Sequence, residues 1–346
     1  MQREWLTEYE WRTQNVRKPK RPDWWGAQCM YPKKRMIRNR GFQRGLMAVS
    51  LAAALMLPFA VPAPETQDFA VLQAGQQPVA AARSVNAIAY RLPGEITYQQ
   101  QIFPRSKLLR GKLLVVSPQY PLPDDLPAPN TASVAQKGNG MIPVRSLQVR
   151  TGYETIDALK QLFEQLRSEG VEGLYVQQGM MSRAQQTDAL LRQMRTLMKT
   201  SSIAQAQESL FQTAEPAGTG SLLLEYAVEI SPADGSALET SPQGQRLLQL
   251  CWRYGFVRES AQRPFRFRYV GKAHATAMTY LDLDLESYLA WMRRKEVLVV
   301  SSGGIPQYLI LCKPMQGDYA AFDLPVGAAC EISMDNTGYA LAACTL

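Results

Sequence analysis

The chain of 346 residues contains a single histidine, His274, and this restricts the chemistry that it can perform. A metal site built from several imidazoles cannot form. A Ser-His-Asp or Cys-His arrangement would need His274 as its base. The sequence therefore leaves little room for hydrolysis that depends on histidine.

The five cysteines include no CxxC pair, so neither a zinc ribbon nor a thioredoxin-like site is indicated. Three of them, Cys312, Cys330 and Cys344, lie in the last 35 residues. If the region is exported, one disulfide can form among these three. We favour the alternative, that they are small, buried, apolar side chains.

Asp282, Asp284 and Glu286 alternate with leucines, and this spacing would suit either a cation site or the solvated start of a helix. We favour the helix start, because carboxylates are stabilising near a helix N-terminus.

The elements that must position any site alternate between helix and strand. Apolar residues at helical spacing predict helices over residues 154–168, 182–198, 244–255 and 285–294. Extended apolar runs predict strands at 174–177, 222–230 and 265–271, and at the start of 112–130. Four short runs after Val297 predict a small β element. This mixture is typical of the α+β class.

The positive charge is confined to the N-terminal region. Residues 1–44 hold 12 Lys and Arg against 4 Asp and Glu, whereas the remaining residues hold 26 of each sign. A basic surface for nucleic acid is therefore not expected on the folded part, and we predict no nucleic-acid partner.

Residues 45–64 contain no charged side chain and follow a cluster of Lys and Arg. As a helix this segment would span about 30 Å, the thickness of one hydrocarbon core. The positive-inside rule then predicts a single-pass anchor in the cell membrane, with residues 1–44 as a cytoplasmic tail. Residues 65–105 read as a linker of low order, and everything after residue 64 would be extracytoplasmic. A cleaved signal peptide and a buried core helix are the alternatives.

Four segments between Lys112 and Leu289 carry a recognisable pattern. They are LLVVSPQYPLPDDLPAP (113–129), WRYGFVRES (252–260), FRFRYVGKAHA (265–275) and LDLESYL (283–289). In this order they resemble the VanY-type D-alanyl-D-alanine carboxypeptidases, which use one zinc ion to remove the terminal D-alanine from cell-wall stem peptides. The resemblance implies an α+β, zinc D-Ala-D-Ala carboxypeptidase-like core over residues 106–295. The membrane anchor would precede this core, and a small C-terminal β extension over 296–346 would follow it.

The zinc-binding positions of that family carry other residues in this chain. The family segment with a histidine and an aspartate ligand matches AGTGSLLLEYAVE (217–229), which puts Leu222 and Glu229 at those positions. The family segment EPWH matches RPFR (263–266), which puts Arg263 at the general base and Arg266 at the third ligand. Leucine cannot coordinate a metal, and arginine stays protonated and offers no lone pair. Zinc, expected of the family, is therefore predicted to be absent, and we predict no other cofactor.

Three further positions follow from the same resemblance. Met181 replaces the family arginine that binds the substrate carboxylate, whereas the adjoining Ser182 is retained. His274 matches a family histidine outside the ligand set, so we expect a structural residue or one at the edge of a pocket. Together with Arg268, these residues are candidates for lining a pocket.

The leading hypothesis is a catalytically inactive member that serves as a cell-wall binding or regulatory module. Its expected partners are the membrane and a peptidoglycan stem peptide or a cell-wall protein. One alternative is an active D-alanyl-D-alanine carboxypeptidase with relocated catalytic residues. The other is an interaction protein that works through its cytoplasmic tail.

Glu229 and Arg266 change in a complementary sense relative to the family pattern. We predict a direct salt bridge between them in place of the ion, since a guanidinium can meet a carboxylate with two hydrogen bonds. Strand alternation would put Arg268 on the same face as Arg266, and Leu222 would close the floor of the site. The alternative is that Arg266 extends into solvent.

Overall fold

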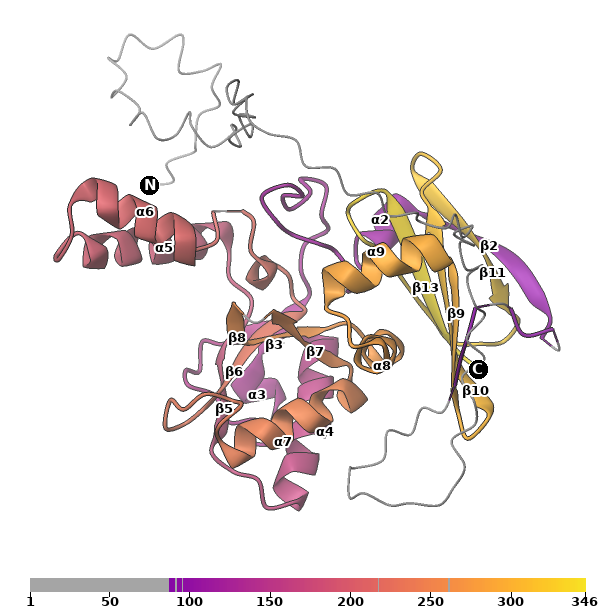
Figure 1. Cartoon of the computed structure of the whole chain (residues 1–346), viewed down its shortest axis with the longest axis horizontal. Helices are drawn as coiled ribbons and strands as arrows, with labels where there is room; N and C mark the ends of the chain where they lie inside the picture. Colours follow the sequence, from indigo (N-terminus) through magenta and orange to yellow (C-terminus); the bar gives the residue numbers. More distant parts are fainter. Residues whose placement is uncertain (1–86, 91, 95, 217, 261) are drawn as a thin grey trace, which may run out of the picture. The chain divides into compact units, whose positions relative to one another are not determined.

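The computed structural model describes residues 87–90, 92–94, 96–216, 218–260 and 262–346 (Figure 1). A four-stranded antiparallel sheet in the order β5-β6-β8-β7 carries the candidate site. Its strands are β5 (Leu174–Gln178), β6 (Ala227–Pro232), β7 (Phe256–Ser260) and β8 (Arg263–Tyr269). The predicted strands at 174–177 and 265–271 are thus confirmed to within two residues at each end.

Helices α4 (Tyr153–Ser168) and α7 (Pro242–Leu250) cover one face of this sheet. The apolar positions of α4 recur at helical spacing and are buried against inward-facing strand residues such as Val228 and Phe267. A short 3-10 helix, η4 (Cys251–Tyr254), continues α7 and ends at Gly255, whose φ of 84° is left-handed. The helices predicted over 154–168 and 244–255 are therefore confirmed.

Helices α5 (Arg183–Leu197) and α6 (Ile203–Thr213) follow β5. Each begins with a capping box, in which Ser182 pairs with Gln185 and Ser202 pairs with Gln205. The helix over 182–198 was predicted, but α6 was not.

A second sheet, antiparallel in the order β1-β9-β10-β13-β12, holds most of the C-terminal region. Its strands are β1 (Ala87–Ala89), β9 (Val297–Ser302), β10 (Ile305–Pro314), β12 (Cys330–Met334) and β13 (Tyr339–Thr345). Helices α8 (Lys272–Leu281) and α9 (Leu285–Lys295) pack against it in a shared core. The predicted helix over 285–294 and the predicted C-terminal β element are confirmed.

Other short elements complete the described chain. They are β2 (Tyr98–Pro104), which pairs with β11 (Tyr319–Pro325), α2 (Arg105–Leu108), β3 (Thr131–Ser133), α3 (Val134–Lys137), β4 (Arg150–Gly152) and η3 (Ser221–Leu223).

Part of the predicted linker, residues 65–105, is ordered. Strands β1 and β2 both fall within it and pair with β9 and β11 of the C-terminal region. Strand β2 was not predicted because YQQQIFP is mostly exposed and shows no alternation of apolar and polar residues. The rest of the linker up to residue 86, the tail 1–44 and the anchor 45–64 lie outside the described ranges. Within those ranges no helix is both long and apolar enough to cross a membrane.

Two predicted strand segments are not strands. The run from Lys112 to Val115 is buried but joins no sheet, since the Arg268 guanidinium donates to the carbonyls of Lys112 and Leu114. Residues 222–226 also lie outside the sheet, because the carbonyl of Glu225 accepts from Gly152 N and from two threonine hydroxyls. The KAHA segment that follows Gly271 begins α8.

Of the cysteines in the described residues, two form a disulfide and two are buried as free thiols. Cys330 and Cys344 are directly opposed on β12 and β13 and form a disulfide. Cys251 and Cys312 are buried thiols.

Candidate functional site

Arg266 lies at the centre of the candidate site, and strand register determines its first partner. It is directly opposite Glu229 in the antiparallel pair of β8 and β6. Its Nε and Nη2 donate to Glu229 Oε1 at 3.2 and 3.0 Å, and Gln177 Nε2 donates to Oε2 of the same carboxylate. The predicted salt bridge is therefore confirmed, and the alternative that Arg266 extends into solvent is wrong, since its side chain is only 6% exposed.

Two further carboxylates surround the same guanidinium. Glu215, from the loop after α6, accepts from Arg266 Nη1 at 2.9 and 2.8 Å through its two oxygens. Glu259, on β7, lies 3.8 Å from Arg266 Nε and accepts from the Ser221 hydroxyl at 2.7 Å. Burial alone would lower the pKa of Arg266, but the three carboxylates outweigh it and hold that pKa above its ordinary value. Arg266 is therefore a fixed positive charge.

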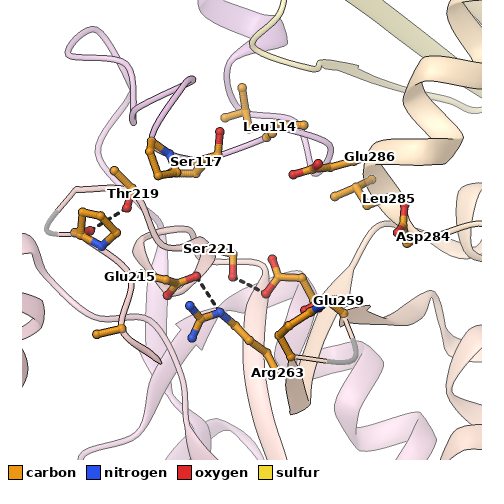
Figure 2. Close-up of a pocket in the computed structure, with 17 residues that line it drawn as sticks. Leu114, Ser117, Glu215, Thr219, Ser221, Glu259, Arg263, Asp284, Leu285 and Glu286 are labelled. Carbon is orange, nitrogen blue, oxygen red and sulfur yellow. Dashed lines mark hydrogen bonds and ion pairs between the residues drawn. The ribbon is translucent and has the colours of Figure 1, made fainter. Parts of the chain in front are cut away.

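Arg263 shares one of these partners from a more open position. Its Nε lies 3.0 Å from Glu215 Oε1, and its side chain is 29% exposed. Figure 2 shows this pair and the Ser221–Glu259 hydrogen bond side by side on the wall of a cavity.

The cavity has a volume of about 550 Å³ and is bounded by four segments of the chain. One wall is the extended run from Leu114 to Pro118, and another is the start of α9 with Asp284, Leu285 and Glu286 (Figure 2). Glu215, Ser221, Glu259 and Arg263 form the wall next to the ionic cluster. Three of these residues, Glu215, Ser221 and Glu259, also contact Arg266, so the cavity lies beside the ionic cluster.

A smaller cavity of about 170 Å³ lies on another side of the cluster. Met181, Leu222, Arg263 and Arg266 line it together with residues of α5 such as Gln186. Here the structure brings together four of the residues that the sequence singled out. Ser182 lines neither of these two cavities, because its hydroxyl caps α5 by accepting from Gln185 N.

Arg268 and His274 are buried and line neither of these two cavities. The Arg268 guanidinium donates to the carbonyls of Lys112 and Leu114, and burial lowers its pKa to about 10. His274, on α8, lies 2.9 Å from the Tyr288 hydroxyl through Nδ1 and borders a separate cavity of about 230 Å³. Arg268 and His274 therefore have structural contacts and do not line the larger cavity.

The residues present do not fit the zinc ion of the resembling family. Zinc needs nitrogen, sulfur or carboxylate donors that converge at about 2 Å. A guanidinium instead occupies the space beside Glu229, and Leu222 offers no donor. Across the part of the chain that the structure describes, no three His, Cys, Asp or Glu side chains are grouped to hold a metal ion.

Glu215 and Glu259 are the site residues that sequence reasoning missed. They come from a loop and from the end of β7, so no periodic pattern marks them. Charge accounting could have found them. Two arginines in one half-buried strand need more than the single carboxylate of Glu229.

Comparison with known proteins gives a sequence relative and a fold. No family model matches the chain. A D-alanyl-D-alanine carboxypeptidase of Enterococcus faecium is 27% identical over 143 residues, which are 38% of this chain and 45% of that protein. The match thus spans less than half the length of this curated relative.

The solved structures include the vancomycin-resistance D,D-dipeptidase VanXYg in complex with a D-Ala-D-Ala phosphinate analogue. Its superposition has a TM-score of 0.60 at 16% identity and covers 72% of this chain and 100% of that one. A vancomycin-resistance D,D-pentapeptidase, VanY, solved with Zn(II), is 25% identical, with a TM-score of 0.43 and coverage of 51% and 98%. The described chain therefore has the peptidase fold that the sequence resemblance implied.

Proposed function

We propose that this chain, which belongs to the VanY-type D-alanyl-D-alanine carboxypeptidase family, is a module at the cell envelope that binds peptidoglycan stem peptides without hydrolysing them. The observation that carries the proposal is Arg266, an ion-paired cation at a position where the family's hydrolysis needs a metal ligand. A guanidinium has no lone pair for a metal, and Arg263 cannot accept a proton as a general base.

The binding half of the proposal rests on the cavity beside this cation. Its volume of about 550 Å³ lies within the range of ligand pockets and suits a short peptide. Its lining mixes apolar residues such as Leu114 with hydroxyls and carboxylates, which can orient a peptide by hydrogen bonds.

The envelope location is part of the same proposal. The basic region 1–44 followed by the uncharged run 45–64 favours a membrane anchor with the folded part outside. The Cys330–Cys344 disulfide adds independent support, because disulfides persist in oxidising compartments.

Titration calorimetry of the purified full chain with a soluble stem pentapeptide ending in D-Ala-D-Ala tests binding. A parallel assay for released D-alanine tests hydrolysis. We expect saturable binding and no release. Release of D-alanine would instead establish a working carboxypeptidase with relocated chemistry, and absence of binding would remove the stem-peptide proposal.

Two matched variants locate the binding. Ala214 lines the cavity, so Ala214→Trp should fill part of it and weaken pentapeptide binding at least tenfold. Ala237 is exposed and lines neither cavity beside Arg266, so Ala237→Trp puts the same side chain on the surface and should leave binding unchanged. Equal loss in both variants, or in neither, would argue against the cavity as the binding site.

A further inference from the structure

We propose that Glu215, Glu229 and Glu259 form a binding site for a guanidinium cation, and that Arg266 occupies this site permanently from within the chain. The tethered cation links the segments that carry these carboxylates. It keeps the cleft assembled whether or not a metal or a ligand is present. This inference goes beyond the proposed function, because it holds whichever ligand the cleft binds.

The contacts of Arg266 reach four separate segments. Nη1 bonds to Glu215 in the loop after α6 and lies 3.5 Å from Ser221 Oγ in η3. Nη2 and Nε bond to Glu229 on β6, and Nε lies 3.8 Å from Glu259 on β7. Every nitrogen of the guanidinium is therefore directed to a carboxylate. One side chain of β8 connects the neighbouring strands to the loop that borders the larger cavity.

The three carboxylates need a cation because they lie close together and are largely shielded from water. Their side chains are only 21–22% exposed, and Arg266 is 6% exposed. Arg263 neutralises part of the charge of Glu215, but neither Glu229 nor Glu259 has an ion pair with it. Without Arg266 the cluster would hold three negative charges against one positive charge, in surroundings where unpaired charge is costly.

The arrangement selects a planar, delocalised cation over a metal ion. A guanidinium spreads its charge over three nitrogens and can be bonded from several sides in one plane. The carboxylates come from three different segments and approach all three nitrogens, with Nε shared between Glu229 and Glu259, so they surround a flat group.

Chemical rescue of the full chain tests the inference. In Arg266→Ala the site would be vacant, and the melting temperature should fall by roughly 10 °C, because three carboxylates lose their shared counterion. Methylguanidinium should restore a large part of this loss at concentrations that leave the wild type unchanged. Methylurea, a neutral molecule of the same shape, should restore none of it.

Arg263→Ala is the matched control, since Arg263 is more exposed and, among the described residues, forms its ion pair with Glu215 alone. The Arg263→Ala substitution should lower the melting temperature much less than Arg266→Ala does. Methylguanidinium should not raise the melting temperature of Arg263→Ala. If methylguanidinium and methylurea act alike on Arg266→Ala, or if the two arginine variants behave alike, the proposal is wrong. Stoichiometric zinc in the purified wild type would also overturn it.

A double variant covers the case in which Arg266→Ala does not fold. Arg266→Ala with Glu229→Gln removes one of the stranded charges and keeps the side-chain volume. It should yield more folded protein than Arg266→Ala alone. A double variant that is as unstable as the single one, or less stable, would contradict the proposed charge relationship.

Discussion

His274 gives a quantitative prediction of how stability depends on pH. Its ring is 4% exposed and Nδ1 lies 2.9 Å from the Tyr288 hydroxyl. Burial, assisted by the nearby charge of Lys112, lowers the pKa of His274 to about 3, against an ordinary value near 6.5. The folded chain therefore keeps His274 neutral at a pH where the unfolded chain protonates it.

The size of the effect follows from proton linkage. Below pH 6.5 the unfolded state binds one more proton at this residue than the folded state, so acidification destabilises the fold by about 1.4 kcal/mol per pH unit. Between pH 7 and pH 5 the free energy of unfolding should fall by about 2 kcal/mol because of His274 alone. A shift of one unit in the folded pKa would not change this figure, because His274 would still be neutral at pH 5.

Urea denaturation of the wild type and of His274→Asn at the two pH values measures this contribution. The pKa of Glu225 is raised by burial, which favours the folded state on acidification, so it acts in the opposite direction and is common to both proteins. The chain has no second histidine to mask the result. Tyr288→Phe removes the hydrogen-bond partner but not the titrating ring, so it should keep the pH dependence. Equal pH dependence in the wild type and His274→Asn would refute the reasoning.

Four other outcomes are expected. The purified chain should hold no stoichiometric zinc by elemental analysis, and EDTA should not lower its melting temperature; a drop of many degrees would show that the ligands have been misidentified. Protease added to intact protoplasts should degrade the folded region, whereas full protection would reverse the proposed orientation. Cys330→Ser should cost about 3 kcal/mol in chemical denaturation, since the disulfide closes a loop with a sequence separation of 14; a loss near zero would mean that the bond is not formed. Acetylating a free ammonium on the pentapeptide should weaken its binding, because the cavity is lined by one arginine and four carboxylates, those of Glu215, Glu259, Asp284 and Glu286; unchanged affinity would contradict this.

The sequence was sufficient for those parts of the site that depend on local periodicity. Strand alternation put Arg266 and Arg268 on one face of β8, and the phenylalanine between them, Phe267, lies in the core on the other face. The pairing of Glu229 with Arg266 followed from residue types on two adjacent strands. Glu215 and Glu259 could not be placed in this way, since their approach to Arg266 depends on how a loop and a third strand pack.

The errors in the fold have a similar origin. The run LLVV after Lys112 has the composition of a strand, but its hydrogen bonds go to a buried guanidinium, to the Ser333 hydroxyl and to the carbonyl of Asp335. A sequence pattern reports burial and cannot identify the partner of a backbone group. Strand β2 is the opposite error, a real strand that was not predicted. It is mostly exposed, so it has no apolar face that a sequence pattern could detect.

The three arginines of β8 differ in how deeply they are buried and in how their positive charge is neutralised. Arg263 is partly solvated and needs one carboxylate, whereas Arg266 is nearly buried and has three around it. Arg268 is buried, and within the described residues it forms no ion pair; its guanidinium donates to backbone carbonyls and lies over the Tyr226 ring. This difference in partners explains why the pKa of Arg266 is raised whereas the pKa of Arg268 is lowered. Deep burial alone therefore does not define the candidate site; what distinguishes Arg266 from its neighbour is the set of acids that the surrounding segments supply.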